Sequence, residues 1–146
     1  MLHLSPTINQ REFISSRIAA FDREVSPVRR WLEPYVREHQ ALPLYSGWTR
    51  TIGIRSSGEL VEWSTETEWS GSRPVDDFTW EACALVRGAS RYPELHSLVP
   101  PRPSTDAVTC TRCEGRGVLF PDRPELDCEC GNLGWVLLPS SASGAG

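Results

Sequence analysis

The chain has 146 residues and six tryptophans, and 39% of it is apolar, enough for one domain with a hydrophobic core and a small appendage. All fifteen basic residues are arginine, and the net charge of −4 argues against a general nucleic-acid binder, which usually presents a basic face. The absence of any stretch of about 18 apolar residues excludes a membrane-spanning helix. The first residues also lack the features of a secretory signal. We therefore expect a cytoplasmic protein, in which paired cysteines favour a metal over a disulfide.

Two helices are predicted near the start of the chain. Apolar residues recur at helical spacing over 8–25 and again from Pro27 to about His39. Pro34 should kink the second helix or divide it, because proline lacks the amide that a helix interior uses. The two adjoining apolar stripes predict a helical hairpin.

A small antiparallel sheet and a third helix should follow. Residues 42–47 read as a connection, and 48–54 and 60–64 read as a β-hairpin with Gly58 in a left-handed conformation. A third short strand is expected to include Trp69. Asp76 and Asp77 precede a helix predicted over about 77–89, which Gly88 should end. The expected fold class is therefore α+β.

Prolines mark the boundary within the chain. Three of the four residues 100–103 are proline, which predicts a stiff extended connector. We assign 1–98 to the α+β domain, 99–107 to the connector, 108–138 to a cysteine module and 139–146 to a disordered tail. In the module, 118–120 and 135–138 are expected to pair as two short strands.

Four of the five cysteines lie in this module as two close pairs. Cys110 and Cys113 form the first pair, and Cys128 and Cys130 form the second. Each pair is followed by glycines, which allow tight turns beside a metal. Two thiolates from each pair can together enclose one tetrahedral zinc ion.

The segment Cys110-Thr111-Arg112-Cys113-Glu114-Gly115-Arg116-Gly117 resembles the CxxCxGxG element of the DnaJ-type cysteine-rich zinc finger. The resemblance covers about 25 residues and implies that Cys110, Cys113, Cys128 and Cys130 bind one zinc ion. The second pair departs from the pattern, with one residue between its cysteines and differently spaced glycines. The chain also lacks the His-Pro-Asp of a J-domain, so the resemblance implies a zinc fold and no co-chaperone activity.

Other readings of the cysteines stay open at this point. Two disulfides or free thiols could replace the metal site, and Asp127 could take the place of one thiolate. Four thiolates would fill the coordination shell, so a zinc ion here should be structural. Cys83 falls within the predicted third helix and reads as a buried structural thiol.

An acidic, tryptophan-containing segment is the main candidate for contact with a partner. Residues 59–81 carry seven acidic residues against one arginine, with tryptophans interleaved. Rings that supply buried area and carboxylates that steer a basic partner are typical of an interface. A solvated hairpin whose tryptophans pack inward is the alternative. The candidate partner-binding residues are Glu62, Trp63, Glu66, Glu68 and Trp69.

These features favour a small bacterial protein that is not an enzyme and acts through protein contacts. Its most specific form is an immunity protein or antitoxin that neutralises a basic toxin. The order of helices and hairpin, followed by Gly-Glu-Leu-Val-Glu-Trp, resembles SMI1/KNR4-type immunity proteins.

Two alternatives belong to other functional classes. A nucleic-acid-binding regulator would use Arg112, Arg116 and Arg123, although residues 104–139 carry twice as many acidic residues as arginines. An enzyme would have to assemble its site from scattered residues, because the sequence contains no recognisable catalytic motif.

Overall fold

The structure, a computed structural model, describes residues 2–21, 33–46, 50–64, 71–103, 105–117, 120, 122, 128, 130 and 132–137. The chain divides into two compact units, Met1–Val99 and Pro100–Gly146. The first contains helices and a four-stranded antiparallel sheet, and the second contains the four clustered cysteines. The predicted α+β class is thereby confirmed.

The first helix, α1 (Ile8–Ala19), begins with a capping box. The Thr7 side chain accepts a hydrogen bond from the Gln10 amide at 3.1 Å, and the Gln10 side chain accepts one from the Thr7 amide at 2.9 Å. These two bonds satisfy amides that have no partner within the helix. The helix was predicted over 8–25, but α1 ends at Ala19 with Ala20 as its C-cap, and residues 22–25 lie outside the described residues.

Helix α3 (Glu33–His39) corresponds to the end of the second predicted helix. Pro34 is its second residue, where an amide would have no partner in the first turn, so proline costs no helical hydrogen bond. The residues before α3, from 22 to 32, are outside the described part of the chain.

The sheet has the order β1-β2-β3-β4, with antiparallel neighbours throughout. Its central hairpin joins β2 (Arg50–Ile54) to β3 (Leu60–Ser64), and Gly58 in the connecting turn has the predicted positive φ, 97°. The outer strands are β1 (Leu42–Ser46) and β4 (Ser72–Pro74). Trp69, expected in the third strand, falls outside the described residues.

Strand β1 corrects one prediction, because residues 42–46 were expected to be a connection. Pro43 lacks an amide, but β1 is an edge strand, and its register with β2 shifts between Pro43 and Tyr45. Prolines are tolerated at edges and bulges because fewer ladder hydrogen bonds are required there.

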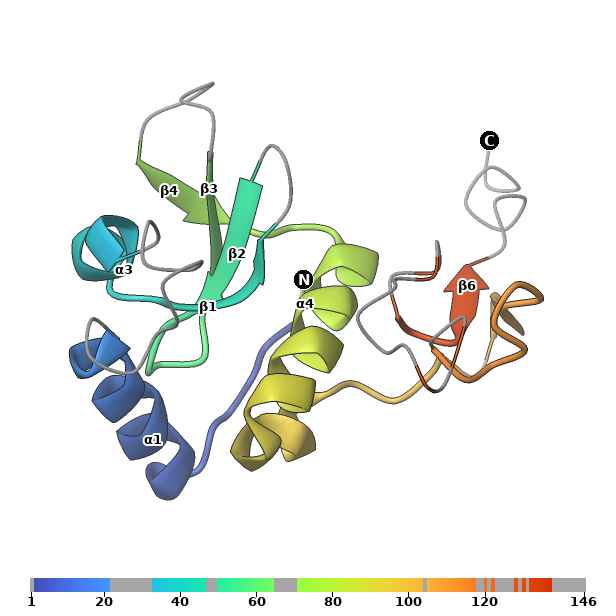
Figure 1. The fold of residues 1–146 in the computed structure, drawn as a ribbon, viewed down its shortest axis with the longest axis horizontal. Coiled ribbons are helices and arrows are strands. Elements are labelled where there is room, and N and C mark those ends of the chain that lie inside the picture. Colours follow the sequence, from blue (N-terminus) through green and yellow to red (C-terminus); the bar gives the residue numbers. More distant parts are fainter. Residues whose placement is uncertain are drawn as a thin grey trace. The chain divides into compact units, whose positions relative to one another are not determined.

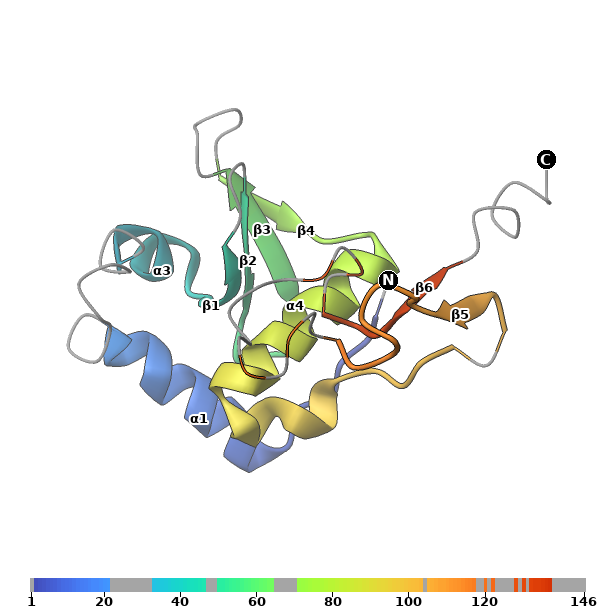
Figure 2. The ribbon, with the colours of Figure 1, turned by 45° about the vertical axis from the view of Figure 1, so that its right-hand side comes forward.

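Helices cover both faces of the sheet, with α3 on one side and α4 (Phe78–Arg91) on the other (Figures 1 and 2). The main core lies between the sheet, α1 and α4, and includes Ile14, Ile52 and Leu85. On the opposite face, Trp63 packs with Ala41 and Val61 and against Tyr35 of α3.

Helix α4 continues past the predicted end at Gly88. It runs to Arg91 and is followed by a 3-10 helix, η2 (Pro93–Leu98). Gly88 lies where Leu44 of β1 meets the helix, and a Cβ built on it would come within 2.5 Å of Leu44 Cδ2. The glycine therefore permits close packing and does not end the helix.

The cysteine-containing unit has a two-stranded antiparallel sheet of β5 (Ala107–Thr109) and β6 (Trp135–Leu137). Strand β6 pairs with β5, and residues 118 and 119, which were expected to pair with it, lie outside the described residues. This pairing joins the chain just before Cys110 to the chain just after Cys130, and the Cys110 amide extends the ladder by donating to Gly134 O at 3.0 Å. Among the described residues, none of the helices is long and apolar enough to cross a membrane.

Candidate metal centre

The four cysteines of the C-terminal unit bring their sulfur atoms together. All four Sγ atoms lie within 4.8 Å of one another, and all four residues are buried. Cys110 Sγ lies 3.6 Å from Cys128 Sγ, and Cys113 Sγ lies 3.8 Å from Cys130 Sγ. A disulfide would need about 2.05 Å, so the thiols are free in this arrangement.

The spacing of the sulfurs fits a tetrahedral metal ion. Zinc–sulfur bonds of about 2.3 Å in a tetrahedron place the sulfurs about 3.8 Å apart. The two short contacts in the cluster match that separation. The cluster could therefore hold a metal ion with only small movements of the side chains.

In each of two tight turns, a backbone amide donates a hydrogen bond to the sulfur of the cysteine that begins the turn. The Gly117 amide donates to Cys113 Sγ at 3.3 Å, and the Gly134 amide donates to Cys130 Sγ at 3.3 Å. In each turn the donor is the fourth residue after the cysteine. Amide donors stabilise a thiolate, so both turns are suited to presenting a charged sulfur to a cation.

The backbone angles of the two turns also correspond. The residue two positions after the cysteine has a positive φ in both: 84° at Gly115 and 68° at Asn132. Asparagine tolerates this conformation better than most residues. The second pair departs from the zinc-finger pattern in sequence, but at this described position asparagine has the same positive φ as the glycine of the first turn.

The two turns pack directly against each other through their backbones. A Cβ on Gly134 would lie 2.5 Å from Gly115 O, and a Cβ on Gly117 would lie 2.7 Å from Asn132 O. The Asn132 side chain also donates to Gly117 O at 3.0 Å. These glycines are therefore required both by their positive φ and by the space between the turns.

The environment gives the thiols different acidities. Burial would by itself raise the pKa of Cys113, but hydrogen bonds from the Gly117 amide, the Cys130 thiol and other neighbours lower it to about 7. Burial raises the pKa of Cys128, and it raises that of Cys130 to about 12. A divalent cation would compensate the charge of further thiolates and so favour their deprotonation.

The structure brings together the four cysteines predicted as ligands. Asp127, considered as a substitute ligand, is outside the described residues. Cys83 is buried in α4, in the other unit. Sequence reasoning missed the two amide donors, Gly117 and Gly134, although their shared position four residues after a cysteine could have identified them.

The predicted partner-binding residues are placed only in part. Glu62 is 6% exposed, and its carboxylate accepts hydrogen bonds from Arg50 and, at 2.8 Å, from Arg73. Trp63 is 1% exposed and packs beneath α3. Both side chains are thus buried within the first unit. The other three candidates, Glu66, Glu68 and Trp69, lie outside the described residues.

Comparisons of the chain with models of known families, with curated proteins and with solved structures gave no match.

Proposed function

We propose that this protein is not an enzyme, that one structural zinc ion holds its C-terminal unit together, and that it acts through contacts with other proteins. The ligands would be the thiolates of Cys110, Cys113, Cys128 and Cys130. The observation that supports the metal site is the clustering of four buried sulfurs within 4.8 Å of one another, with two contacts of 3.6 and 3.8 Å.

A structural role follows from the chemistry of the ligands. Catalytic zinc usually keeps one coordination position for water or substrate, whereas four thiolates complete the shell. The bound ion would link the turn after Cys113 to the turn after Cys130. The amides of Gly117 and Gly134 would hold two of the thiolates in place.

The small size of the second hydrophobic cluster supports the same role. Among the described residues from 100 onward, the buried apolar side chains are the four cysteines and Trp135. So small a core supplies little free energy of folding, and metal binding can supply the remainder.

The narrower hypothesis, capture of a basic toxin by an acidic surface, has less support than the metal site. The carboxylate of Glu62 forms ion pairs with Arg50 and Arg73, and Trp63 is buried. The hypothesis therefore depends on Glu66, Glu68 and Trp69, and it stays a prediction.

Serine substitutions test the proposed ligand set in the full chain. We expect Cys110→Ser and Cys130→Ser to lower the zinc content of purified, reduced protein from about one equivalent to a small fraction of that, because each removes a thiolate. Zinc would be measured by elemental analysis after gel filtration. Cys83→Ser, which alters a buried cysteine outside the cluster, is the matched control and should retain the metal. Full zinc content in the Cys130→Ser protein would contradict the proposed ligand set.

A further inference from the structure

One carboxylate inside the first unit has an oxygen without a partner. Glu81 lies in the first turn of α4 and is 1% exposed. Its Oε2 atom accepts a hydrogen bond from the Leu2 amide at 2.9 Å, whereas its Oε1 atom is buried and has no hydrogen-bond partner among the described residues. Buried carboxylates are normally paired with a cation or fully hydrogen-bonded, because their loss of hydration is costly. A bound ligand would account for the exception at Glu81.

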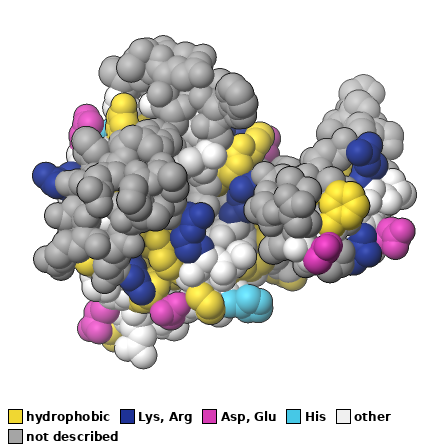
Figure 3. Space-filling model, viewed as in Figure 1, with side chains coloured by type: hydrophobic (Ala, Val, Ile, Leu, Met, Phe, Trp, Pro, Cys, Tyr) yellow, Lys and Arg dark blue, Asp and Glu magenta, His cyan; other side chains and the backbone are white. Residues whose placement is uncertain are grey.

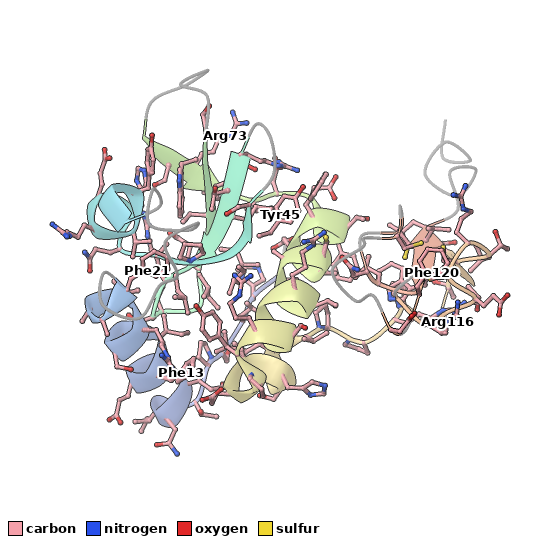
Figure 4. All side chains as sticks on the ribbon, viewed as in Figure 1. Phe13, Phe21, Tyr45, Arg73, Arg116 and Phe120 are labelled. Carbon is pink, nitrogen blue, oxygen red and sulfur yellow. The ribbon has the colours of Figure 1, made fainter. Side chains whose placement is uncertain are left out.

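The arginines of the adjoining hairpin and of β4 do not neutralise this carboxylate. Arg55, just after β2, pairs with Glu59, and Arg73 of β4 pairs with Glu62. Figure 4 shows Arg73 on the sheet, apart from α4. Among the described residues, Glu81 therefore has no cationic partner.

Glu81 lines a cavity of about 290 Å³. The wall is formed by the N-terminal segment, the β2–β3 turn, the end of β4 and the start of α4. Figures 1 and 2 both show the N-terminal segment beginning beside α4. The volume is at the lower end of the range for ligand pockets, about 300–1,000 Å³, so the cavity suits a small ligand or a single side chain. The apolar residues of the wall are Leu2, Leu4, Leu60, Pro74 and Val75.

This combination of groups fits an organic cation. An ammonium group can donate to the free Oε1 atom, and the apolar side chains can cover an attached alkyl chain. A hard metal ion would require about six oxygen ligands. The described wall offers few of these, since Glu59 is already paired with Arg55. On the face shown in Figure 3, acidic and basic side chains are mixed among the described residues, so the unpaired buried charge is the more selective feature.

The N-terminal segment gives a route to the free oxygen. Because Oε1 is buried, a ligand has to displace part of the wall to reach it. Residues 2–4 belong to no helix or strand, and Leu2 and Leu4 are only half-buried. The Leu2 amide is bonded to the same carboxylate, so a small movement of this segment would uncover Oε1 and leave the sheet and α4 in place.

We propose that this cavity binds a primary ammonium group on an apolar chain, with Glu81 as its counter-ion. A free alkylamine and a lysine side chain of another protein both present this chemistry, and the experiment distinguishes them. The inference goes beyond the proposed function and does not depend on the zinc ion.

Titration of the full, isotopically labelled chain with hexylamine, followed by NMR, tests the site. The Leu2 amide signal should shift on binding, because this amide donates to the same carboxylate. We expect Glu81→Gln, which keeps an acceptor for the Leu2 amide but removes the charge, to weaken hexylamine binding at least about tenfold, as loss of a charge-assisted hydrogen bond does. Glu12→Gln makes the same change at an exposed position on α1 and should leave the affinity unchanged.

Hexanol provides a second control, which needs no variant and so applies even if Glu81→Gln does not fold. It has the same chain without the charge, and wild-type protein should bind it at least about tenfold more weakly than hexylamine. A lysine capped at both ends identifies the source: tighter binding than hexylamine assigns a lysine side chain, and weaker binding assigns a free amine. The site is overturned if neither amine binds, if hexanol and hexylamine bind equally, or if folded Glu81→Gln keeps the wild-type affinity.

Discussion

At the scale of single residues, the metal centre depends on glycines as much as on cysteines. Gly134 and Gly115 lie back to back in the two turns, each with a positive φ. The amide of Gly134 also donates to Cys130 Sγ, and its carbonyl accepts from the Cys110 amide. A side chain at this position would disturb both turns at once.

Gly134→Ala should therefore disrupt the C-terminal unit. The left-handed conformation costs a residue with a Cβ about 1–2 kcal/mol, and the added atom would lie 2.5 Å from Gly115 O. Because the close neighbour is backbone, overlap should bring the total cost to about 3 kcal/mol or more, as overpacking does elsewhere. We expect the variant to retain less zinc and to lose it at lower chelator concentration than the wild type.

Gly71→Ala provides the matched control. Gly71 has a similar φ, 73°, but a Cβ there would meet no atom of the described residues within 4 Å. This substitution should cost only the conformational term and leave the zinc content unchanged. If the two alanine variants release zinc alike, the close packing of the two turns does not contribute to the site.

At the scale of elements, α4 and β1 fit together because Gly88 admits the side chain of Leu44. Composition alone suggested that this glycine ends the helix, since glycine is common at that position. The apolar spacing predicted α4 itself. The role of Gly88 could not be predicted, because it depends on a contact with β1, a strand that the sequence did not reveal. Pro43 concealed that strand, because prolines are unusual in strands other than at edges.

A double-mutant cycle at Gly88 and Leu44 tests this fit. Gly88→Ala gains about 1 kcal/mol of helix propensity but should be destabilising overall, because overpacking costs about 1–3 kcal/mol. Leu44→Ala should cost about 2–5 kcal/mol by itself. In the Leu44→Ala background the added methyl group has space, so Gly88→Ala should then be neutral or stabilising. Free energies of unfolding from urea titrations measure all four proteins, and strictly additive effects would show that the contact is unimportant.

The arrangement of the strands also shows why the charge of the segment 59–81 could not be interpreted from sequence. A count of charges in 59–81 predicted an acidic face, but the sheet register places Glu62 opposite Arg73 and within reach of Arg50. Arg50 is on β2 and Arg73 is on β4, whereas Glu62 is on β3. Arg50 also precedes the segment 59–81, so the count of charges did not include it. Pairing across strands depends on the fold, and no local pattern predicts it.

At the scale of the whole molecule, the two units are stabilised differently. The first has a large apolar core between its sheet and helices, whereas in the described part of the second the buried cluster consists of four cysteines. The cysteine cluster could be predicted because ligand spacing is local in sequence and the chemistry of thiolates is specific. The strand pairing around it could not, because β5 and β6 are three residues each and far apart in the chain.

The most direct test of a zinc ion bound by four thiolates is zinc K-edge X-ray absorption on the full-length, reduced protein. We predict about one zinc per chain, with four sulfur neighbours at about 2.3 Å and no nitrogen or oxygen neighbour. A shell containing oxygen or nitrogen at about 2.0–2.2 Å, or fewer than four sulfurs, would contradict the proposed centre.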